Sequence, residues 1–449
     1  MRISLIYGGN RLPVQLLTAF GRACVILSLL LWGLMPLRAA SPDENVASAD
    51  GPDAELKEFR LDALETRLQT MQPGAEHDYF AGVMANRTGH VEDSIHLLTS
   101  ALPSIRESQP ERAAVALETL ADDYTKTFHY GDAARAYDDL LAHFASYSAP
   151  KDDSSIAHVL QGAPPQTITW QGPVRLKTER NPIGILDMEL TVNGVRERWV
   201  LDTGASMSLA SRGFAQRLGL KPLPGTAQMG AGGTGIENRV QVALLPTLAI
   251  GGTTLKNVVM MIFDDANLKI GSGKHAYQIN AILGFPVLKA FGTITFLRDG
   301  EFEAGDVAQR NASGARMYLK LLKPIIECGV EGKELPFTLD TGATETELQV
   351  QYYERFHGEI GSWKKGSEIS SGAGGNVRRK TYVQPQLDLA VGDKTVTLKR
   401  VTILPVKLNN AMDEFYGNLG QDFVAGFESF TLDFSKMTFS LGAPLGSPR

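Results

Sequence analysis

Cysteine is scarce in this chain of 449 residues, which contains only two, Cys24 and Cys328. Cys24 lies in an apolar run near the start, so a chain that lost this run would keep Cys328 alone. One cysteine cannot form an internal disulfide, and the remaining chain must therefore be stabilised by packing. Cys328 lies in an alternating stretch that predicts a strand, and we interpret it as a small core residue.

Motifs for metals, nucleotides and nucleic acids are also missing. The eight histidines show none of the paired spacings that hold zinc. Residues 271–274 read Gly-Ser-Gly-Lys, but they lack the earlier glycine of a phosphate loop and are followed by His275 instead of Ser or Thr. The basic run at residues 378–380 is short and is typical of a solvated strand end. The sequence therefore predicts no metal, no cofactor and no nucleic-acid partner.

Acidic residues are missing from residues 1–40, which contain four arginines. An apolar run spans residues 23–37 and contains Gly33 and Pro36. A basic start followed by an apolar run resembles a signal peptide that ends near Ala40. An uncleaved membrane anchor through residues 23–37 is the alternative. Either segment predicts an exported protein, periplasmic or secreted.

The rest of the chain divides into two parts of different charge. Residues 41–160 carry 22 acidic and 9 basic residues, whereas residues 161–449 carry 28 and 31. A difference of this kind indicates distinct domains with different surfaces. The composition, 43% hydrophobic and 21% charged, is ordinary for globular domains and supplies ample material for a core.

Residues 41–160 are predicted to form an acidic helical domain and a linker. The spacing of one tetratricopeptide repeat is kept by Gly82, Gly89, Ser94, Leu98 and Ala101. In that repeat, small residues let two antiparallel helices cross closely, so the region resembles a tetratricopeptide-like pair of helical hairpins. A small helical bundle outside any repeat family is the alternative. Either module would bind a protein partner or act as a spacer.

Residues 161–449 are predicted to be all-β. Apolar residues alternate with a period of two in short runs, which lie at residues 183–188, 240–244, 258–263, 318–322 and 396–398. Short helices are expected near residues 212–218 and 351–356. The predicted fold class is mainly β, with two pseudo-symmetric lobes, residues 161–309 and 310–449, preceded by the small α-helical domain.

Two stretches of the β region repeat each other 138 residues apart. Residues 199–206 read Trp-Val-Leu-Asp-Thr-Gly-Ala-Ser, and residues 337–344 read Phe-Thr-Leu-Asp-Thr-Gly-Ala-Thr. A hairpin signal lies nine residues before each Asp. Downstream, Ile-Leu-Gly at residues 282–284 is echoed by Asn-Leu-Gly at residues 418–420. The chain therefore carries an internal duplication of about 140 residues, with one Asp-Thr-Gly in each copy.

Each Asp-Thr-Gly follows an apolar run and so places a carboxylate on a tight turn at the end of a buried strand. Two copies related by a pseudo-two-fold axis bring Asp202 and Asp340 together at that axis. Two neighbouring carboxyl groups do not both ionise readily, so the pair shares one proton. The ionised member can take a proton from a water that attacks an amide carbonyl, while the protonated member polarises that carbonyl.

These motifs resemble those of the pepsin and retropepsin class of aspartic peptidases, in the two-lobed, single-chain form. The resemblance covers residues 171–443 and implies two pseudo-symmetric all-β aspartic-protease lobes, with Asp202 and Asp340 as the catalytic dyad. The implied function is that of an exported aspartic endopeptidase. Such an enzyme acts on polypeptides, uses no cofactor and has a monomeric catalytic unit when both lobes lie in one chain.

The resemblance also implies roles for the residues around the dyad. Thr203 and Thr341 would cross-link the two turns, and the further supporting residues are Gly204, Gly342, Ser206 and Thr344. Two glycine-rich stretches fall where the family has its flaps, and the predicted flap residues are Gly230, Gly232, Gly233, Gly374 and Gly375. Pepsin-like members carry a Tyr in the first flap. The sequence has none there and is closer to retropepsin-like members.

Many pepsin-like members also carry Ser or Thr directly after Asp-Thr-Gly, where its hydroxyl lowers the pKa of the outer carboxylate. Ala205 and Ala343 stand at these positions here. The apparent pKa values of the dyad are therefore expected above the roughly 1.5 and 4.7 of pepsin. Ser206 and Thr344 are the nearest candidates to supply the missing hydrogen bonds.

Two other interpretations stay open at this point. A catalytically silent peptide-binding or scaffold protein would use the lobes and the helical domain for interaction, although a pure binding protein needs no paired carboxylates. Residues 41–160 would alternatively form an inhibitory prosegment, although prosegments of pepsin-like members are basic and this region is acidic. If the chain is an enzyme, with or without a prosegment, residues 161–449 are expected to fold and to act as a monomer without the helical domain.

Overall fold

The computed structural model describes most of the chain after residue 50. The described residues are 51–148, 150–230, 234–271, 276–310, 314–360, 363–372 and 375–446. The apolar run at residues 23–37 and three of the predicted flap residues, Gly232, Gly233 and Gly374, lie outside them. Among the described residues, no helix combines the length and the apolar character needed to cross a membrane.

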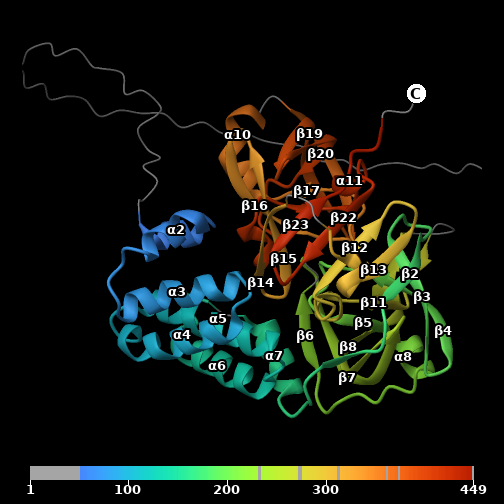
Figure 1. Ribbon diagram of the computed structural model, residues 1–449, viewed down its shortest axis with the longest axis horizontal. Coiled ribbons are helices and arrows are strands. Elements are labelled where there is room, and N and C mark those ends of the chain that lie inside the picture. Colours follow the sequence, from blue (N-terminus) through green and yellow to red (C-terminus); the bar gives the residue numbers. More distant parts are fainter. Residues whose placement is uncertain are drawn as a thin grey trace, which may run out of the picture. The chain divides into compact units, whose positions relative to one another are not determined.

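A helical region comes first in the described chain and is followed by a mainly β region (Figure 1). The helices of the first region are α1 (Pro52–Lys57), α2 (Leu61–Leu68), α3 (Ala75–Arg87), α4 (Val91–Ile105), α5 (Pro110–Lys126), α6 (Tyr130–His143) and α7 (Lys151–Leu160). The predicted fold class, mainly β with a small helical domain in front, is confirmed.

Helices α3 and α4 form a close hairpin. Gly89, with a φ of 82°, lies in the turn between them, in a conformation that glycine adopts without strain. A Cβ atom at Gly82 of α3 would lie 2.7 Å from Leu98 Cγ of α4. The close crossing of helices that the spacing predicts is therefore present. The assignment to the tetratricopeptide family stays a prediction.

The β region begins with lobe 1. Its strands are β1 (Thr167–Trp170), β2 (Val174–Arg180), β3 (Leu186–Val192), β4 (Val195–Leu201), β5 (Ser208–Ser211), β6 (Ala227–Gly230), β7 (Glu237–Ile250), β8 (Thr253–Phe263), β9 (Lys269–Ile270), β10 (Tyr277–Gln278), β11 (Ala281–Leu283), β12 (Thr293–Leu297) and β13 (Glu301–Ala304). Its helices are α8 (Arg212–Arg217) and α9 (Phe285–Lys289), and α8 lies where a short helix was predicted.

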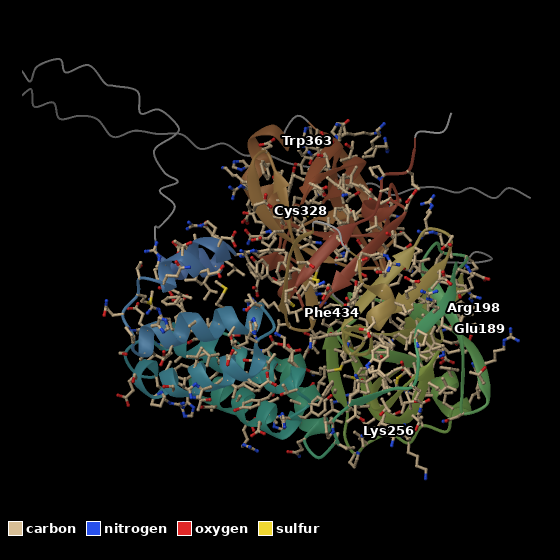
Figure 2. All side chains as sticks on the ribbon, viewed as in Figure 1. Glu189, Arg198, Lys256, Cys328, Trp363 and Phe434 are labelled. Carbon is tan, nitrogen blue, oxygen red and sulfur yellow. The ribbon has the colours of Figure 1, made fainter. Side chains whose placement is uncertain are left out.

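Lobe 2 follows. Its strands are β14 (Ala315–Lys320), β15 (Lys323–Val330), β16 (Lys333–Leu339), β17 (Glu347–Leu348), β18 (Lys364–Gly372), β19 (Gly375–Val391), β20 (Lys394–Ile403), β21 (Gly417–Leu419), β22 (Ser429–Asp433) and β23 (Thr438–Leu441). Its helices are α10 (Val350–Ile360), near the predicted position, and α11 (Gln421–Val424). Cys328 is fully buried in β15 (Figure 2), which confirms it as a core residue.

The two lobes repeat one topology. In lobe 1, the hairpin β3–β4 turns at Asn193 and Gly194, and β4 runs parallel to β11. In lobe 2, the hairpin β15–β16 turns at Glu331 and Gly332, and β16 runs parallel to β21. The short strands β5 and β17 then pair antiparallel with β11 and β21. The repeat in the sequence is therefore a repeat in the structure.

One antiparallel sheet runs through both lobes, in the order β2-β13-β12-β22-β23-β14. At its centre Thr295 of β12 pairs with Thr431 of β22, and their hydroxyl oxygens are 2.7 Å apart. Nearby, the ring of Phe434, which is labelled in Figure 2, packs against Phe285 of lobe 1, with centroids 5.4 Å apart. The pseudo-two-fold axis passes between β12 and β22, so the two lobes share a core.

The helical region packs directly on the lobes, and all of it belongs to the same unit, Asp50–Arg449. Tyr318, Ile325 and Phe415 of lobe 2 are buried in one cluster with the core of the helices. Ile156 of α7 is buried in another cluster with residues of lobe 1, among them Val242. The helices and the lobes therefore pack into one compact unit.

Candidate active site

The two Asp-Thr-Gly turns lie at equivalent strand ends, directly after β4 and β16. The amide of Asp202 donates to the carbonyl of Leu283 at 3.1 Å, and the amide of Asp340 donates to that of Leu419 at 2.9 Å. Each parallel strand pair therefore continues into its turn, which fixes the backbone that carries the carboxyl group. The topology brings both Asp residues to the axis between the lobes.

Thr203 and Thr341 cross-link the two turns. The hydroxyl of Thr203 donates to the carbonyl of Leu339, and that of Thr341 donates to the carbonyl of Leu201, both at 2.7 Å. Each hydroxyl also accepts from the amide of the other threonine, at 3.0 and 3.1 Å. Both side chains are buried, so these four hydrogen bonds form a rigid base under the turns.

Gly204 and Gly342 let the carboxyl groups approach each other. A Cβ atom at Gly204 would lie 2.5 Å from Asp340 Cγ, and one at Gly342 would overlap the carboxylate of Asp202. Each Asp therefore lies against the glycine of the opposite turn. A residue with a side chain at either position would push the two carboxyl groups apart, so these glycines are needed for the pair itself.

The two carboxyl groups are half-buried and receive few hydrogen bonds. Asp202 Oδ1 accepts from the amides of Gly204 (2.8 Å) and Ala205 (3.0 Å), and Asp340 Oδ1 accepts from the amide of Gly342 (2.8 Å). Burial, with the charge of Asp340 as the second cause, raises the pKa of Asp202 well above its ordinary value. The pair therefore retains one shared proton at mildly acidic pH.

A side chain that we did not predict as a site residue, Asn418, contacts the dyad. Its Nδ2 donates to Asp340 Oδ2 at 2.9 Å, and its Oδ1 accepts from the hydroxyl of Thr338 at 2.7 Å. In lobe 1 the equivalent positions hold Ile282 and Val200, which pair in the same register. In the sequence, this polar pair at positions that are apolar in the other copy was the signal that could have identified Asn418 as a site residue.

A second pair of hydroxyl groups anchors the glycines that follow the apolar strands. Gly284 N donates to Ser208 Oγ at 3.0 Å, and Gly420 N donates to Thr346 Oγ1 at 3.1 Å. A Cβ atom at Gly284 would overlap the backbone of Met207 and Ser208, and one at Gly420 would overlap the backbone of Glu345. Ser208 and Thr346 each lie two residues beyond Ser206 and Thr344, the residues that were predicted to donate to the dyad.

A cleft with a volume of about 490 Å³ opens above the dyad. Asp202, Asp340, Ser206 and Thr344 all line it, and so does Lys323, whose amine donates to the carbonyl of Gly204 at 3.1 Å. Within the described ranges, no group of three or more His, Cys, Asp or Glu side chains is arranged to hold a metal ion.

The two predicted flaps are hairpins beside the cleft. Gly230 ends β6 and lines the cleft, whereas Gly375 begins β19 and is absent from the cleft lining. The first hairpin leans on the second, because Thr234 Cγ2 lies against Gly372 and the carbonyl of Thr234 accepts from Arg379 at 2.5 Å. Of the five predicted flap residues, the described chain places only Gly230 at the cleft.

The helical region reaches this wall of the cleft through α7. The amide of Gly230 donates to Asp152 Oδ2 at 2.7 Å, and the amide of Gln228 donates to Ser155 Oγ at 2.8 Å. Strand β6 pairs with β7 along its other edge. The side chains of α7 therefore occupy the free edge of β6, where unpaired backbone groups would otherwise be exposed. No motif in either segment pointed to this contact.

Comparisons with known proteins complete the description. No curated protein matches the chain. Among solved structures, basic 7S globulin from soybean is 12% identical over 61% of this chain and 95% of that chain, with a TM-score of 0.39. A family model described as aspartyl protease matches residues 188–287, which contain Asp202 and the Ile-Leu-Gly element of lobe 1.

Proposed function

We propose that the chain is an aspartic endopeptidase that hydrolyses peptide bonds with a water activated by Asp202 and Asp340. One observation carries the proposal, namely two half-buried carboxyl groups held against each other at the floor of a cleft, on turns that a symmetric set of hydrogen bonds joins. A pair of acids with different protonation states is the arrangement that general acid–base hydrolysis requires. The aspartyl protease family match supports the same class.

The surroundings of the two carboxyl groups assign their roles. Asp340 is the ionised member, because hydrogen-bond donors reach both of its oxygens, whereas both donors to Asp202 reach the same oxygen, Oδ1. Asp202 is the protonated member, because burial and the neighbouring charge raise its pKa. Asp340 takes one proton from the water as the water oxygen attacks the amide carbon. Asp202 donates its proton to the carbonyl oxygen, which gives a tetrahedral diol.

Collapse of this diol completes the reaction. One hydroxyl returns its proton to Asp202 as the carbonyl re-forms, and the C–N bond breaks as Asp340 passes the proton from water to the leaving nitrogen. Both carboxyl groups then have their starting protonation states. No redox step and no other reactant is needed.

The helical region is part of the folded enzyme in this proposal, and the prosegment interpretation loses support. No described residue of 51–160 lines the cleft, whereas an inhibitory segment would fill it. We propose that the protein is exported to the periplasm or the outside of the cell, on the basis of its basic start and apolar run. We also propose a monomeric catalytic unit, since one chain supplies both carboxyl groups.

Hydrolysis of a denatured protein mixture tests the proposal. The wild-type chain, Asp202→Asn and Asp340→Asn are compared, with Asp306→Asn as a control because Asp306 is an exposed carboxylate away from the cleft. Each dyad variant is expected to lose about 10⁴-fold or more in kcat, with the control unchanged. Turnover close to wild type in either dyad variant would remove the peptidase proposal. Peptide binding without hydrolysis by the wild type would favour the scaffold alternative.

A further inference from the structure

The two walls of the cleft differ in chemistry. The wall from lobe 1 is apolar and includes Ile183, Ile185, Val200, Leu209, Phe263 and Ile282. The wall from lobe 2 is polar and acidic and includes Thr346, Glu347, Glu368, Ser370, Thr402 and Asn418. The lobes share one topology, so the difference lies in the side chains and not in the backbone.

Equivalent positions show the change most directly. In lobe 1, Ile282 of β11 pairs with Val200 on one side and with Leu209 on the other. In lobe 2, Asn418 of β21 pairs with Thr338 and with Glu347 in the same way. Three apolar side chains above one Asp therefore correspond to three polar side chains above the other. The apolar triplet suits an apolar substrate side chain, and the polar triplet does not.

Two carboxylates stand together on the polar wall. Glu347 Oε1 accepts from Gln349 at 3.3 Å, and Glu368 Oε1 accepts from the hydroxyl of Thr402, the residue that pairs with Glu347 in the sheet, at 2.8 Å. Arg379 lies close enough to Glu347 to lower its pKa, but burial has the larger effect and raises that pKa to about 7. A bound cation would hold Glu347 in its ionised form.

The same wall offers apolar surface beside the carboxylates. Ile369, which is 53% exposed, and Met412 both line the cleft. Lysine and arginine side chains pack their methylene stems on such surface while the charged end reaches an acidic group. Among the described residues that line the cleft, Lys323 is the single basic side chain, and it donates to the carbonyl of Gly204 in lobe 1.

We propose that the cleft selects polypeptides with an apolar residue on one side of the scissile bond and Lys or Arg on the other. The apolar residue binds the wall of lobe 1, and the basic residue binds Glu347 and Glu368 of lobe 2. This inference rests on the proposed function, because a scissile bond exists only if the chain hydrolyses peptides. The preference for this pair of side chains also applies to binding alone.

The test begins with the wild-type chain and a library of peptides from a digested proteome, with the cleaved bonds identified by mass spectrometry. Two peptides that differ only in Lys or Met beside the preferred bond then follow. We expect the Lys peptide to have a kcat/KM about tenfold higher, as one charge-assisted hydrogen bond would give. Glu368→Gln, a change in an exposed side chain, and Glu347→Gln should bring the ratio close to one. Glu354→Gln, exposed on α10 away from the cleft, is the control.

Binding separates this inference from the proposed function. The Asp202→Asn chain, in which hydrolysis is blocked, is titrated against both peptides by fluorescence anisotropy. Tighter binding of the Lys peptide supports the inference even if the wild type cleaves nothing, an outcome that overturns the peptidase proposal alone. Cleavage between two apolar residues without enrichment of Lys or Arg overturns the inference and leaves the peptidase proposal standing. Equal binding of the two peptides overturns the inference in either case.

Discussion

Asp202 and Asp340 end equivalent strands, yet one hydrogen bond from a side chain distinguishes them. Asn418 donates to Oδ2 of Asp340, and Thr338 orients that amide by donating to its oxygen. A donor to a carboxylate stabilises its charged form. The dyad therefore has a built-in preference for the charge on Asp340.

We expect Asn418→Ile, which copies Ile282 of lobe 1, to shift only one limb of the pH profile. Without the donor the singly ionised pair is less stable, so the pKa for loss of the first proton rises. The acid limb of kcat/KM should move up by about one pH unit, the effect of one hydrogen bond to a charged group. The alkaline limb should stay in place, because the donor serves Asp340 in both the singly and the doubly ionised pair.

Thr338→Val provides the matched comparison for this prediction. It leaves Asn418 in place but removes the hydroxyl that orients the amide, so a smaller shift in the same direction is expected. The measurement is kcat/KM against pH for the three chains on one peptide. Identical acid limbs in all three would show that Asn418 does not determine the charge of Asp340.

At this scale the sequence predicted the acids better than their neighbours. The repeat of Asp-Thr-Gly identified Asp202 and Asp340. Two equivalent turns related by a pseudo-two-fold axis meet at that axis, whatever conformations the loops adopt. It did not identify Ser208, Thr346 or Asn418 as contacts of these turns. Which hydroxyl or amide reaches a given backbone group depends on strand twist and register, and neither is visible in residue spacing.

Helix α7 and strand β6 form the contact that links the helical region to the cleft. Asp152 and Ser155 accept hydrogen bonds from two amides on the free edge of β6. Met229 and Gly230 of the same strand line the cleft. The position of this wall therefore depends on side chains that lie outside the lobes.

We expect Asp152→Ala and Ser155→Ala to raise KM several-fold while kcat falls less, because each leaves one amide of β6 without its acceptor and loosens a wall of the cleft. Asp152→Asn retains an acceptor oxygen and should have a KM close to that of the wild type. Lys151→Ala, at an exposed position of the same helix, is the control. Thermal unfolding is measured alongside. Unchanged KM in both alanine variants would show that α7 packs on the lobe without positioning this wall of the cleft.

The helical region also carries a buried polar network that connects its own helices. Asp123 of α5 accepts from Asn86 Nδ2 at 2.6 Å and from Ser94 Oγ at 2.5 Å. The neighbouring Asp122 pairs with Lys126 at 2.8 Å, and both side chains are almost fully buried. Burial raises the pKa of Asp123 to about 7, with Lys126 lowering it and Asp122 raising it further.

This network makes the stability of the whole molecule depend on pH. An unfolded Asp releases its proton near pH 4, whereas folded Asp123 keeps it until about pH 7. Its contribution to stability is therefore complete below pH 4 and is lost as the pH rises to about 7 and above. The melting temperature should fall by a few degrees between pH 5 and pH 8.

Asp123→Asn should make this dependence less steep, because the amide keeps the shape and cannot ionise. The exposed Glu107→Gln is the control and should retain the slope of the wild type. Melting temperatures of the three chains at pH 5 and pH 8 decide the point. The same slope in Asp123→Asn and in the wild type would contradict the assignment.

Much of the molecule's architecture was predictable, but its assembly was not. Two copies with hairpins, turns and Gly elements at matching offsets predicted two similar β lobes. The sheet through Thr295 and Thr431 and the burial of Tyr318 and Phe415 under the helices join segments far apart in the chain, and residue patterns within one segment carry no information on such partners. We now expect residues 161–449 alone to be unstable, since they would expose these contacts.

The central claim is that Asp202 and Asp340 act as one catalytic unit, and a double-mutant cycle tests it most directly. The cycle measures kcat of the wild type, Asp202→Asn, Asp340→Asn and the double variant on one peptide. When two residues act as a unit, replacing either one lowers kcat about as much as replacing both. The two single variants and the double variant should therefore have residual kcat values within about tenfold of one another. Losses that multiply from the single variants to the double variant, or a single variant that retains wild-type turnover, would contradict the account.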